Sequence, residues 1–139
     1  MKMKVAFITD GDTIGVICPS QFEGNKRLRL VGIDCPERKS VEGQIARDYT
    51  YSLCPPNQEI KVVLVTGDRH WGRLVGAVYI EEGIYVNELI VSAGWARAVP
   101  EFQIQTPQWE RIVKAEEWAK RRKLGIWAEG ANSRGSQYK

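Results

Sequence analysis

Short apolar runs separated by turn residues fill the first half of the chain and predict β-strands. Val, Ile, Leu and Phe recur in runs over residues 4–9, 13–18, 26–33, 59–65 and 73–80. Gly, Pro, Asp and Asn, the residues that favour turns, lie between these runs. The pattern therefore predicts a set of five strands.

The turn between the first two runs has the sequence Asp-Gly-Asp at residues 10–12. Asp-Gly between apolar runs is typical of a hairpin because glycine tolerates a positive φ, so we expect these two strands to be antiparallel. In the third run, Arg27 and Arg29 alternate with Leu28 and Leu30. Alternating side chains point to opposite faces, so one face of this strand is charged.

Two helices are predicted in the middle of the chain. Residues 41–53 carry Ile45, Tyr49 and Leu53 at four-residue spacing, the pattern of an apolar helix face. Residues 86–93 form a shorter apolar segment followed by a glycine suited to a left-handed helix cap. Residues 95–99 are a candidate for one more short strand.

The last helix has the clearest pattern. Thr106 is expected to cap it, Pro107 suits its first position, and Gly125 ends it. Ile126 and Trp127 are expected to fold back as a C-terminal clasp. The predicted buried face of this helix comprises Trp109, Ile112, Val113, Ala115, Trp118 and Ala119.

These elements predict a domain over residues 1–127 and a flexible tail over 128–139, which is rich in Gly, Ser, Asn and Gln. Among the apolar positions we assign to the core Val5, Phe7, Leu28, Leu30, Val62, Leu64, Leu74, Val78, Leu89 and Ile112.

Composition agrees with one soluble domain. The chain has 139 residues, 43% hydrophobic and 27% charged, with a net charge of +3. That excludes disordered and fibrous classes. No apolar run approaches the roughly 18 residues of a membrane span, and the apolar start is too short for a signal peptide. We therefore expect no membrane partner and a cytoplasmic protein as written, or a secreted one if a leader was removed.

The cysteines exclude one kind of metal site. The three cysteines form no Cys-x-x-Cys pair and there is one histidine, so a structural zinc site lacks ligands. An odd number of cysteines fits a reducing compartment better than an oxidising one. A Cys35–Cys54 disulfide remains an alternative.

Four carboxylates fall in turns or at strand ends of this basic chain: Asp10, Asp12, Asp34 and Glu37. Carboxylates without histidine or thiolate companions suit a hard cation such as Ca²⁺ or Mg²⁺. The alternative is ordinary turn chemistry, in which Asp stabilises the turn itself.

Two arginines add a second chemistry. Arg29 lies in a predicted strand five residues before Asp34, and Arg73 opens another strand. A cation together with guanidinium groups supplies what phosphodiester chemistry needs, namely stabilisation of the phosphate oxygens as their charge is redistributed. The alternative for each arginine alone is a solvated strand face or an ion pair.

Five blocks of the sequence stand out: Ile8-Thr9-Asp10-Gly11-Asp12-Thr13, Arg29-Leu30-Val31-Gly32-Ile33-Asp34-Cys35-Pro36-Glu37, Trp71-Gly72-Arg73, Val86-Asn87-Glu88 and Lys123-Leu124-Gly125-Ile126-Trp127. In order and spacing they resemble the staphylococcal nuclease family. The resemblance covers residues 5–127. It implies a mainly β fold with helices (α+β), a five-stranded OB-fold barrel with three helices. It also implies Ca²⁺-dependent cleavage of DNA and RNA, as an endonuclease or exonuclease, that leaves 3′-phosphate ends.

The resemblance implies a metal site. Asp12 and Asp34 match the Ca²⁺ ligands that bind through carboxylates. Cys35 stands where the family commonly has Thr and matches a ligand that uses its backbone carbonyl, so the changed side chain should spare it. Asp10 matches an acid close to the metal, in its second shell rather than bound directly.

The resemblance also implies catalytic and substrate-binding residues. Glu37 matches the acid that positions or deprotonates the attacking water, and Arg29 and Arg73 match the pair that clamps the phosphate. Trp71 replaces a family tyrosine that meets the nucleotide. His70 is a weaker candidate for substrate contact.

We expect a monomer that acts on single-stranded or locally opened DNA and RNA. One alternative is an inactive OB-fold module that only binds nucleic acid, favoured by the substitutions at Trp71 and at Pro100, where the family has a second tyrosine. Another is a protein-interaction domain that uses the basic residues 120–123, although a basic last helical turn is more often simply solvated.

Overall fold

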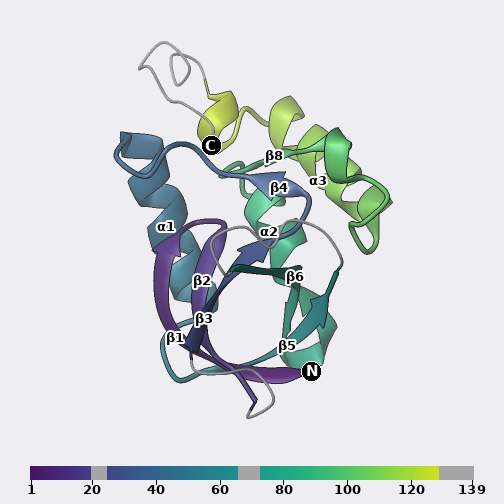
Figure 1. Cartoon of the computed structure of the whole chain (residues 1–139). Helices are drawn as coiled ribbons and strands as arrows, with labels where there is room; N and C mark the ends of the chain where they lie inside the picture. The colour runs from purple at the N-terminus through teal and green to yellow at the C-terminus, as the bar shows by residue number, and fades with distance from the viewer. Residues whose placement is uncertain (20–24, 66–72, 129–139) are drawn as a thin grey trace.

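The computed structural model describes residues 1–19, 25–65 and 73–128. Five strands form a closed barrel in the order β3-β2-β1-β5-β6, and a parallel pairing of β3 with β6 closes it (Figure 1). This mixed α+β architecture of a five-stranded barrel with three helices is consistent with an OB-fold, as predicted. The strands are β1 (Lys2–Asp10), β2 (Thr13–Ile17), β3 (Asn25–Leu30), β5 (Glu59–Leu64) and β6 (Arg73–Ile80).

Three short strands complete the sheets. β7 (Ile84–Tyr85) pairs antiparallel with β6, whereas β4 (Ile33–Asp34) and β8 (Arg97–Ala98) form a separate two-stranded ribbon. In Figure 1 this ribbon lies above the barrel, beside the last helix. β4 carries Asp34 and β8 carries Arg97, and both residues belong to the candidate site described below.

The helices are α1 (Val41–Leu53), α2 (Val86–Ser92) and α3 (Trp109–Arg121). α1 packs on β1, and α2 packs on β6 and α3. Among the described residues, no helix is long and apolar enough to span a bilayer. Single 3₁₀ turns occur at η2 (Glu81–Gly83), η3 (Pro100–Phe102) and η4 (Gly125–Trp127).

The buried face of α1 differs from the prediction. Ile45 is exposed, and the residues that face the barrel include Ala46 and Thr50. The Thr50 hydroxyl donates a 2.6 Å hydrogen bond to the carbonyl of Gly11. Small side chains thus let α1 approach the first hairpin closely, which the spacing of large apolar residues does not reveal.

The hairpin itself is confirmed, with Asp10 paired to Thr13 in an antiparallel register. The reason for its glycine is different from the one expected, because Gly11 does not have a positive φ. A Cβ at Gly11 would lie 2.7 Å from Sγ of Cys35 and 2.9 Å from Cβ of Ala46. Glycine is therefore required at position 11 because there is no room for a Cβ atom.

The predicted start of α3 is wrong. The helix begins at Trp109 after Gln108, whose φ of 54° is left-handed, and Thr106 does not cap it. The Thr106 hydroxyl instead donates a 2.6 Å hydrogen bond to the carbonyl of Phe102. The Thr106 hydroxyl thus stabilises a local turn and does not cap the helix. Pro107 lies before the first helical residue.

The end of α3 also differs, because the helix ends at Arg121, before Gly125. The C-terminal clasp is confirmed. Ile126 is 1% exposed, and its amide donates a 2.7 Å hydrogen bond to the carbonyl of Gly94, the predicted left-handed glycine after α2.

Most predicted core residues are buried, but Phe7 is 46% exposed and Trp118 likewise 46%. An irregularity in the β1–β2 register between Val5 and Phe7 changes the alternation, so Ile8 enters the core instead. Trp118 lies beneath the guanidinium of Arg122, the residue directly after α3, with 3.2 Å between the guanidinium carbon and the ring centroid. Partly buried positions of the predicted core and of the predicted buried face of the last helix are Leu64, Leu74, Leu89, Trp109 and Val113.

Cys18, Cys35 and Cys54 form no disulfide with one another, so the Cys35–Cys54 bridge is not formed in this structure. Burial raises the pKa of the Cys54 thiol to about 12. Cys35 is fully buried as well, against the first hairpin.

Candidate active site

Two aspartates from different elements are buried at the junction of the barrel and the β4–β8 ribbon. Asp12 belongs to the β1–β2 turn and is 0% exposed, and Asp34 ends β4 and is 2% exposed. An isolated buried carboxylate is very unfavourable, so each needs positive charge or hydrogen-bond donors nearby.

Arg29 of β3 contacts both aspartates. Its Nη1 lies 3.5 Å from Oδ2 of Asp12, and its Nη2 lies 3.3 Å from Oδ1 of Asp34. Nη1 also donates a 2.9 Å hydrogen bond to the carbonyl of Leu30. One guanidinium therefore brings the two predicted metal ligands together, which the sequence distance between them did not guarantee.

Arg97 of β8 is a site residue that the sequence analysis missed. Its Nη2 lies 3.3 Å from Oδ2 of Asp34. The register of the ribbon pairs Asp34 directly with Arg97 across 63 residues. The only signal in the sequence was the short apolar run over residues 95–99, which predicted a strand. A local pattern does not indicate the strand with which that run pairs, so the contact with Asp34 was not predicted.

Backbone and hydroxyl donors fix the carboxylate of Asp12. The amide of Cys35 donates a 2.8 Å hydrogen bond to Oδ2, and the hydroxyl of Thr13 donates a 3.2 Å hydrogen bond to Oδ1. Hydrogen bonds that a carboxylate accepts from N–H groups stabilise its charged form. Asp12 is thus held in one orientation by these two donors.

The donor set fits a hard divalent cation. Asp12 and Asp34 each direct one oxygen at the guanidinium of Arg29, so both carboxylates lie beside the same side chain. Within the described ranges, no group of three or more His, Cys, Asp or Glu side chains surrounds a common point. A cation here would therefore have two carboxylates and complete its shell with backbone carbonyls and water, as Ca²⁺ and Mg²⁺ commonly do.

Glu37 lies in the loop between β4 and α1 and is partly buried. Its Oε2 accepts a 2.8 Å hydrogen bond from the amide of Lys39, and its carbonyl accepts one of 2.7 Å from the hydroxyl of Ser40, the N-cap of α1. A Cβ at Gly43 would collide with the carbonyl of Glu37. The first turn of α1 thus positions this loop.

Arg73 opens β6, and its parallel partner in β3 is Arg27. Arg27 and Arg29 lie two residues apart in one strand, so they share a face, and paired residues of neighbouring strands share a face as well. The register therefore puts Arg73 on the same side of the barrel as Arg29. Asp10, at the end of β1, has its Oδ1 3.9 Å from Nε of Arg38.

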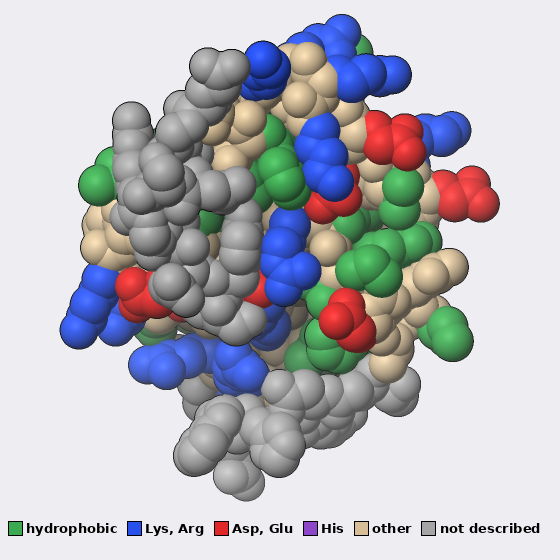
Figure 2. All heavy atoms as spheres, turned by 90° about the horizontal axis from the view of Figure 1, so that it is seen from above, with side chains coloured by type: hydrophobic (Ala, Val, Ile, Leu, Met, Phe, Trp, Pro, Cys, Tyr) green, Lys and Arg blue, Asp and Glu red, His purple; other side chains and the backbone are tan. Residues whose placement is uncertain are grey.

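The two predicted substrate residues, His70 and Trp71, lie outside the described residues, as does the tail from residue 129 onward. Pro100 is described and begins η3. In Figure 2, Lys and Arg side chains are spread over the face seen from above, with acidic side chains between them.

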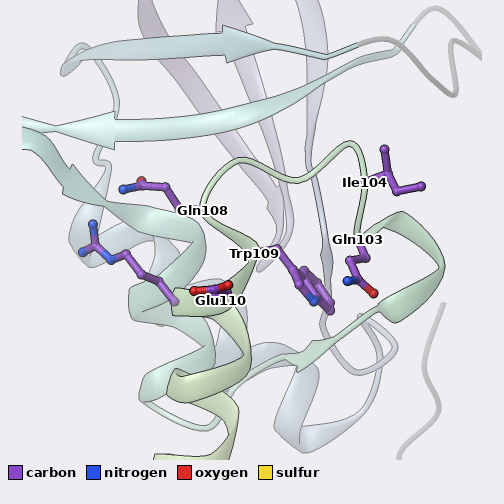
Figure 3. Close-up of a pocket in the computed structure, with 6 residues that line it drawn as sticks. Gln103, Ile104, Gln108, Trp109 and Glu110 are labelled. Carbon is purple, nitrogen blue, oxygen red and sulfur yellow. The ribbon is translucent and has the colours of Figure 1, made fainter.

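A surface pocket lies beside α3, separate from the two buried aspartates. It has a volume of about 550 Å³ and is formed by the segment after η3 and the first residues of α3. Figure 3 shows Gln103, Ile104 and Trp109 along this pocket. Ile104 is 97% exposed. The residues that line this pocket do not include two carboxylates, which a cation would need.

The fold and this arrangement of carboxylates and guanidinium groups define an OB-fold protein with a site suited to a cation and a phosphate. The family model of staphylococcal nuclease homologues matches residues 27–129. The chain belongs to this family. The resemblance in sequence is therefore confirmed.

Individual relatives agree. A protein of Escherichia coli O157:H7 named "Uncharacterized endonuclease" is 32% identical over 126 residues, 91% of this chain and 76% of the relative. A staphylococcal-like nuclease of Arabidopsis thaliana is 32% identical over 104 residues, 73% of this chain and 29% of the relative. An endonuclease of Bacillus subtilis (strain 168) is 28% identical, covering 88% of this chain and 11% of the relative.

Proposed function

We propose that this protein is a Ca²⁺-dependent nuclease that hydrolyses phosphodiester bonds of DNA and RNA and leaves 3′-phosphate ends. The observation that carries the proposal is the contact of Arg29 with both Asp12 and Asp34. It joins a phosphate-binding group to two buried carboxylates at one place. Membership of the staphylococcal nuclease homologue family supports the same reaction.

In this proposal Asp12 and Asp34 hold the cation through their carboxylates, with the backbone carbonyl of Cys35 as a further ligand and Asp10 nearby. Bound Ca²⁺ would supply Lewis-acid polarisation of the phosphate and compensate its charge. Both aspartates are buried, so little water surrounds their carboxylates. Electrostatic attraction between a carboxylate and a cation is stronger where water is excluded.

Glu37 accepts a proton from, or orients, the water that attacks phosphorus. The P–O5′ bond then breaks, the 5′ oxygen takes up a proton, and the phosphate stays on the 3′ side. Arg29 and Arg73 donate hydrogen bonds to the phosphate oxygens as their negative charge is redistributed. Because water is the nucleophile, a 2′-hydroxyl is not needed, which is why both DNA and RNA are proposed.

We propose that a monomer is active, because the carboxylates of Asp12 and Asp34 and the guanidinium groups that contact them meet within a single chain. The substrate is single-stranded or locally opened nucleic acid, because a phosphate must reach a guanidinium that is only 20% exposed. His70 and Trp71 remain proposed contacts to the nucleotide.

The test is hydrolysis of single-stranded DNA and of RNA by the purified full chain with Ca²⁺, with Mg²⁺ and with chelator. We expect Ca²⁺-dependent cleavage that Glu37→Gln lowers by about 100-fold or more. End-group analysis should find 3′-phosphates. Glu117→Gln, an exposed residue of α3, is the control. Oligonucleotide binding without cleavage would instead support a module that only binds nucleic acid.

A further inference from the structure

We propose that Arg97 is a positioning residue of this site. Its guanidinium holds one oxygen of Asp34 and thereby keeps the other oxygen turned toward the cation position beside Asp12. This inference rests on the proposed function, because the cation position is part of it.

Each oxygen of the Asp34 carboxylate has its own guanidinium. Oδ1 lies 3.3 Å from Nη2 of Arg29, and Oδ2 lies 3.3 Å from Nη2 of Arg97. A carboxylate held on both sides has a fixed plane, since turning it would separate both pairs. With 2% of Asp34 exposed, water competes little for these contacts.

The two arginines are anchored differently. Arg29 belongs to the barrel, whereas Arg97 belongs to the ribbon that also carries Asp34. That ribbon is fixed to α3, because the amide of Ala98 donates a 2.7 Å hydrogen bond to Oε2 of Glu116. The contact of Arg97 with Asp34 therefore does not depend on Arg29.

This difference matters for the proposed reaction. Arg29 is required to contact the phosphate, and its 2.9 Å bond to Leu30 and its two carboxylate contacts already engage its terminal nitrogens. If it exchanges the Asp34 contact for a phosphate, Asp34 would be free to rotate unless another group holds it. Arg97 holds the carboxylate of Asp34 through its contact with Oδ2.

The alternative is that Arg97 acts only through its charge. The formal charges of Asp12, Asp34 and Arg29 sum to −1, and Arg97 brings the sum to zero. If charge alone mattered, removal of Arg97 would attract a divalent cation more strongly. Positioning predicts the opposite sign, because a carboxylate that is no longer held loses orientation.

The experiment is calorimetric titration of Ca²⁺ into the full chain without nucleic acid. We expect Arg97→Met to raise the Kd for Ca²⁺ by about tenfold or more, the usual cost of losing a residue that orients a metal ligand. Arg97→Lys, which retains a donor, should restore part of the affinity. Arg111→Met, which removes an arginine paired with Glu88 away from the site, should leave the Kd unchanged.

Thermal melting of each variant with chelator separates this effect from unfolding, and only variants folded at the titration temperature are compared. An unchanged or lower Kd in Arg97→Met would overturn the positioning role. If the unaltered protein binds Ca²⁺ without cleaving nucleic acid, the nuclease proposal fails while the Kd values still decide the role of Arg97. If it binds no Ca²⁺, both proposals fail.

Discussion

The backbone amide of Cys35 donates a 2.8 Å hydrogen bond to Oδ2 of Asp12, 23 residues earlier in the chain. Cys35 directly follows Asp34, so this bond fixes the segment that carries one carboxylate to the hairpin that carries the other. The donor is main chain. The side chain of Cys35 does not take part in this hydrogen bond and packs against Gly11.

The first prediction concerns this bond. Asp12→Ala removes the acceptor from a buried amide and one carboxylate from Arg29, so we expect the free energy of unfolding to fall by about 1–3 kcal/mol. Urea denaturation with chelator present measures it. Asp48→Ala, whose side chain is 73% exposed, should change stability by less than about 0.5 kcal/mol. Equal stability of the two variants would contradict the importance of the bond.

The second prediction concerns the packing of Gly43 against Glu37. Alanine at position 43 would collide with the carbonyl of Glu37 and displace its loop, so we expect kcat to fall by about 10- to 100-fold. Gly83→Ala is the matched control. Gly83 has a φ of +72° and open space around it, so alanine there costs about 1 kcal/mol of backbone strain.

Steady-state hydrolysis and urea denaturation of both variants distinguish the two effects. Gly83→Ala should lose stability and retain the rate of the unaltered protein. If Gly43→Ala hydrolyses DNA at the same rate as Gly83→Ala, the loop position is not set by Gly43.

The third prediction concerns removal of the cation. A ligand that binds only the folded protein stabilises it by about 2.7 kcal/mol at a concentration one hundred times its Kd. We expect saturating Ca²⁺ to raise the melting temperature and chelator to reverse this. Asp34→Asn should abolish the response, whereas Glu59→Gln, an exposed acid on β5, should retain it. A Ca²⁺ response that survives Asp34→Asn would place the cation elsewhere.

The fourth prediction concerns pH. Burial raises the pKa of Cys54 to about 12 from an ordinary value of 9.0. The folded protein therefore retains this proton at pH values where the unfolded chain releases it. Below the unfolded pKa the thiol has no effect on the pH dependence. Above it, stability falls by up to about 1.4 kcal/mol per pH unit until the folded pKa is reached.

Urea denaturation between about pH 8 and 11 measures this loss. We expect a steeper fall for the unaltered protein than for Cys54→Ala, which lacks the thiol. The half-buried Cys18 provides the matched variant, Cys18→Ala, with a smaller change in slope because it is less buried. Identical slopes for the Cys54 variant and the unaltered protein would contradict the prediction.

Local patterns were enough to predict most elements. The bounds of α1 were predicted from turn signals and spacing, and the antiparallel first hairpin from Asp-Gly. The carboxylates of Asp12 and Asp34 were singled out because residues of that type at strand ends suit a hard cation. The structure brings these two together, while their roles remain proposals.

The errors arose where distant segments decide the outcome. Phe7 is exposed because a register irregularity against β2 shifts the alternation, and α1 buries Ala46 because the hairpin approaches it closely. Arg97 was missed for the same reason. Its partner is set by the pairing of two-residue strands across 63 positions, and periodicity within a strand has no information about that pairing.

The contact of Gly94 with Gly125 has a consequence for how this sequence can change. Both residues have positive φ, and a Cβ at either one would meet the main chain of the segment that contains the other. A clash with a side chain can be relieved by shortening that side chain, but main chain has no smaller replacement. A substitution at one of these two positions therefore cannot be compensated by a substitution at the other. We expect both glycines to be required for the fold, although neither belongs to the proposed active site.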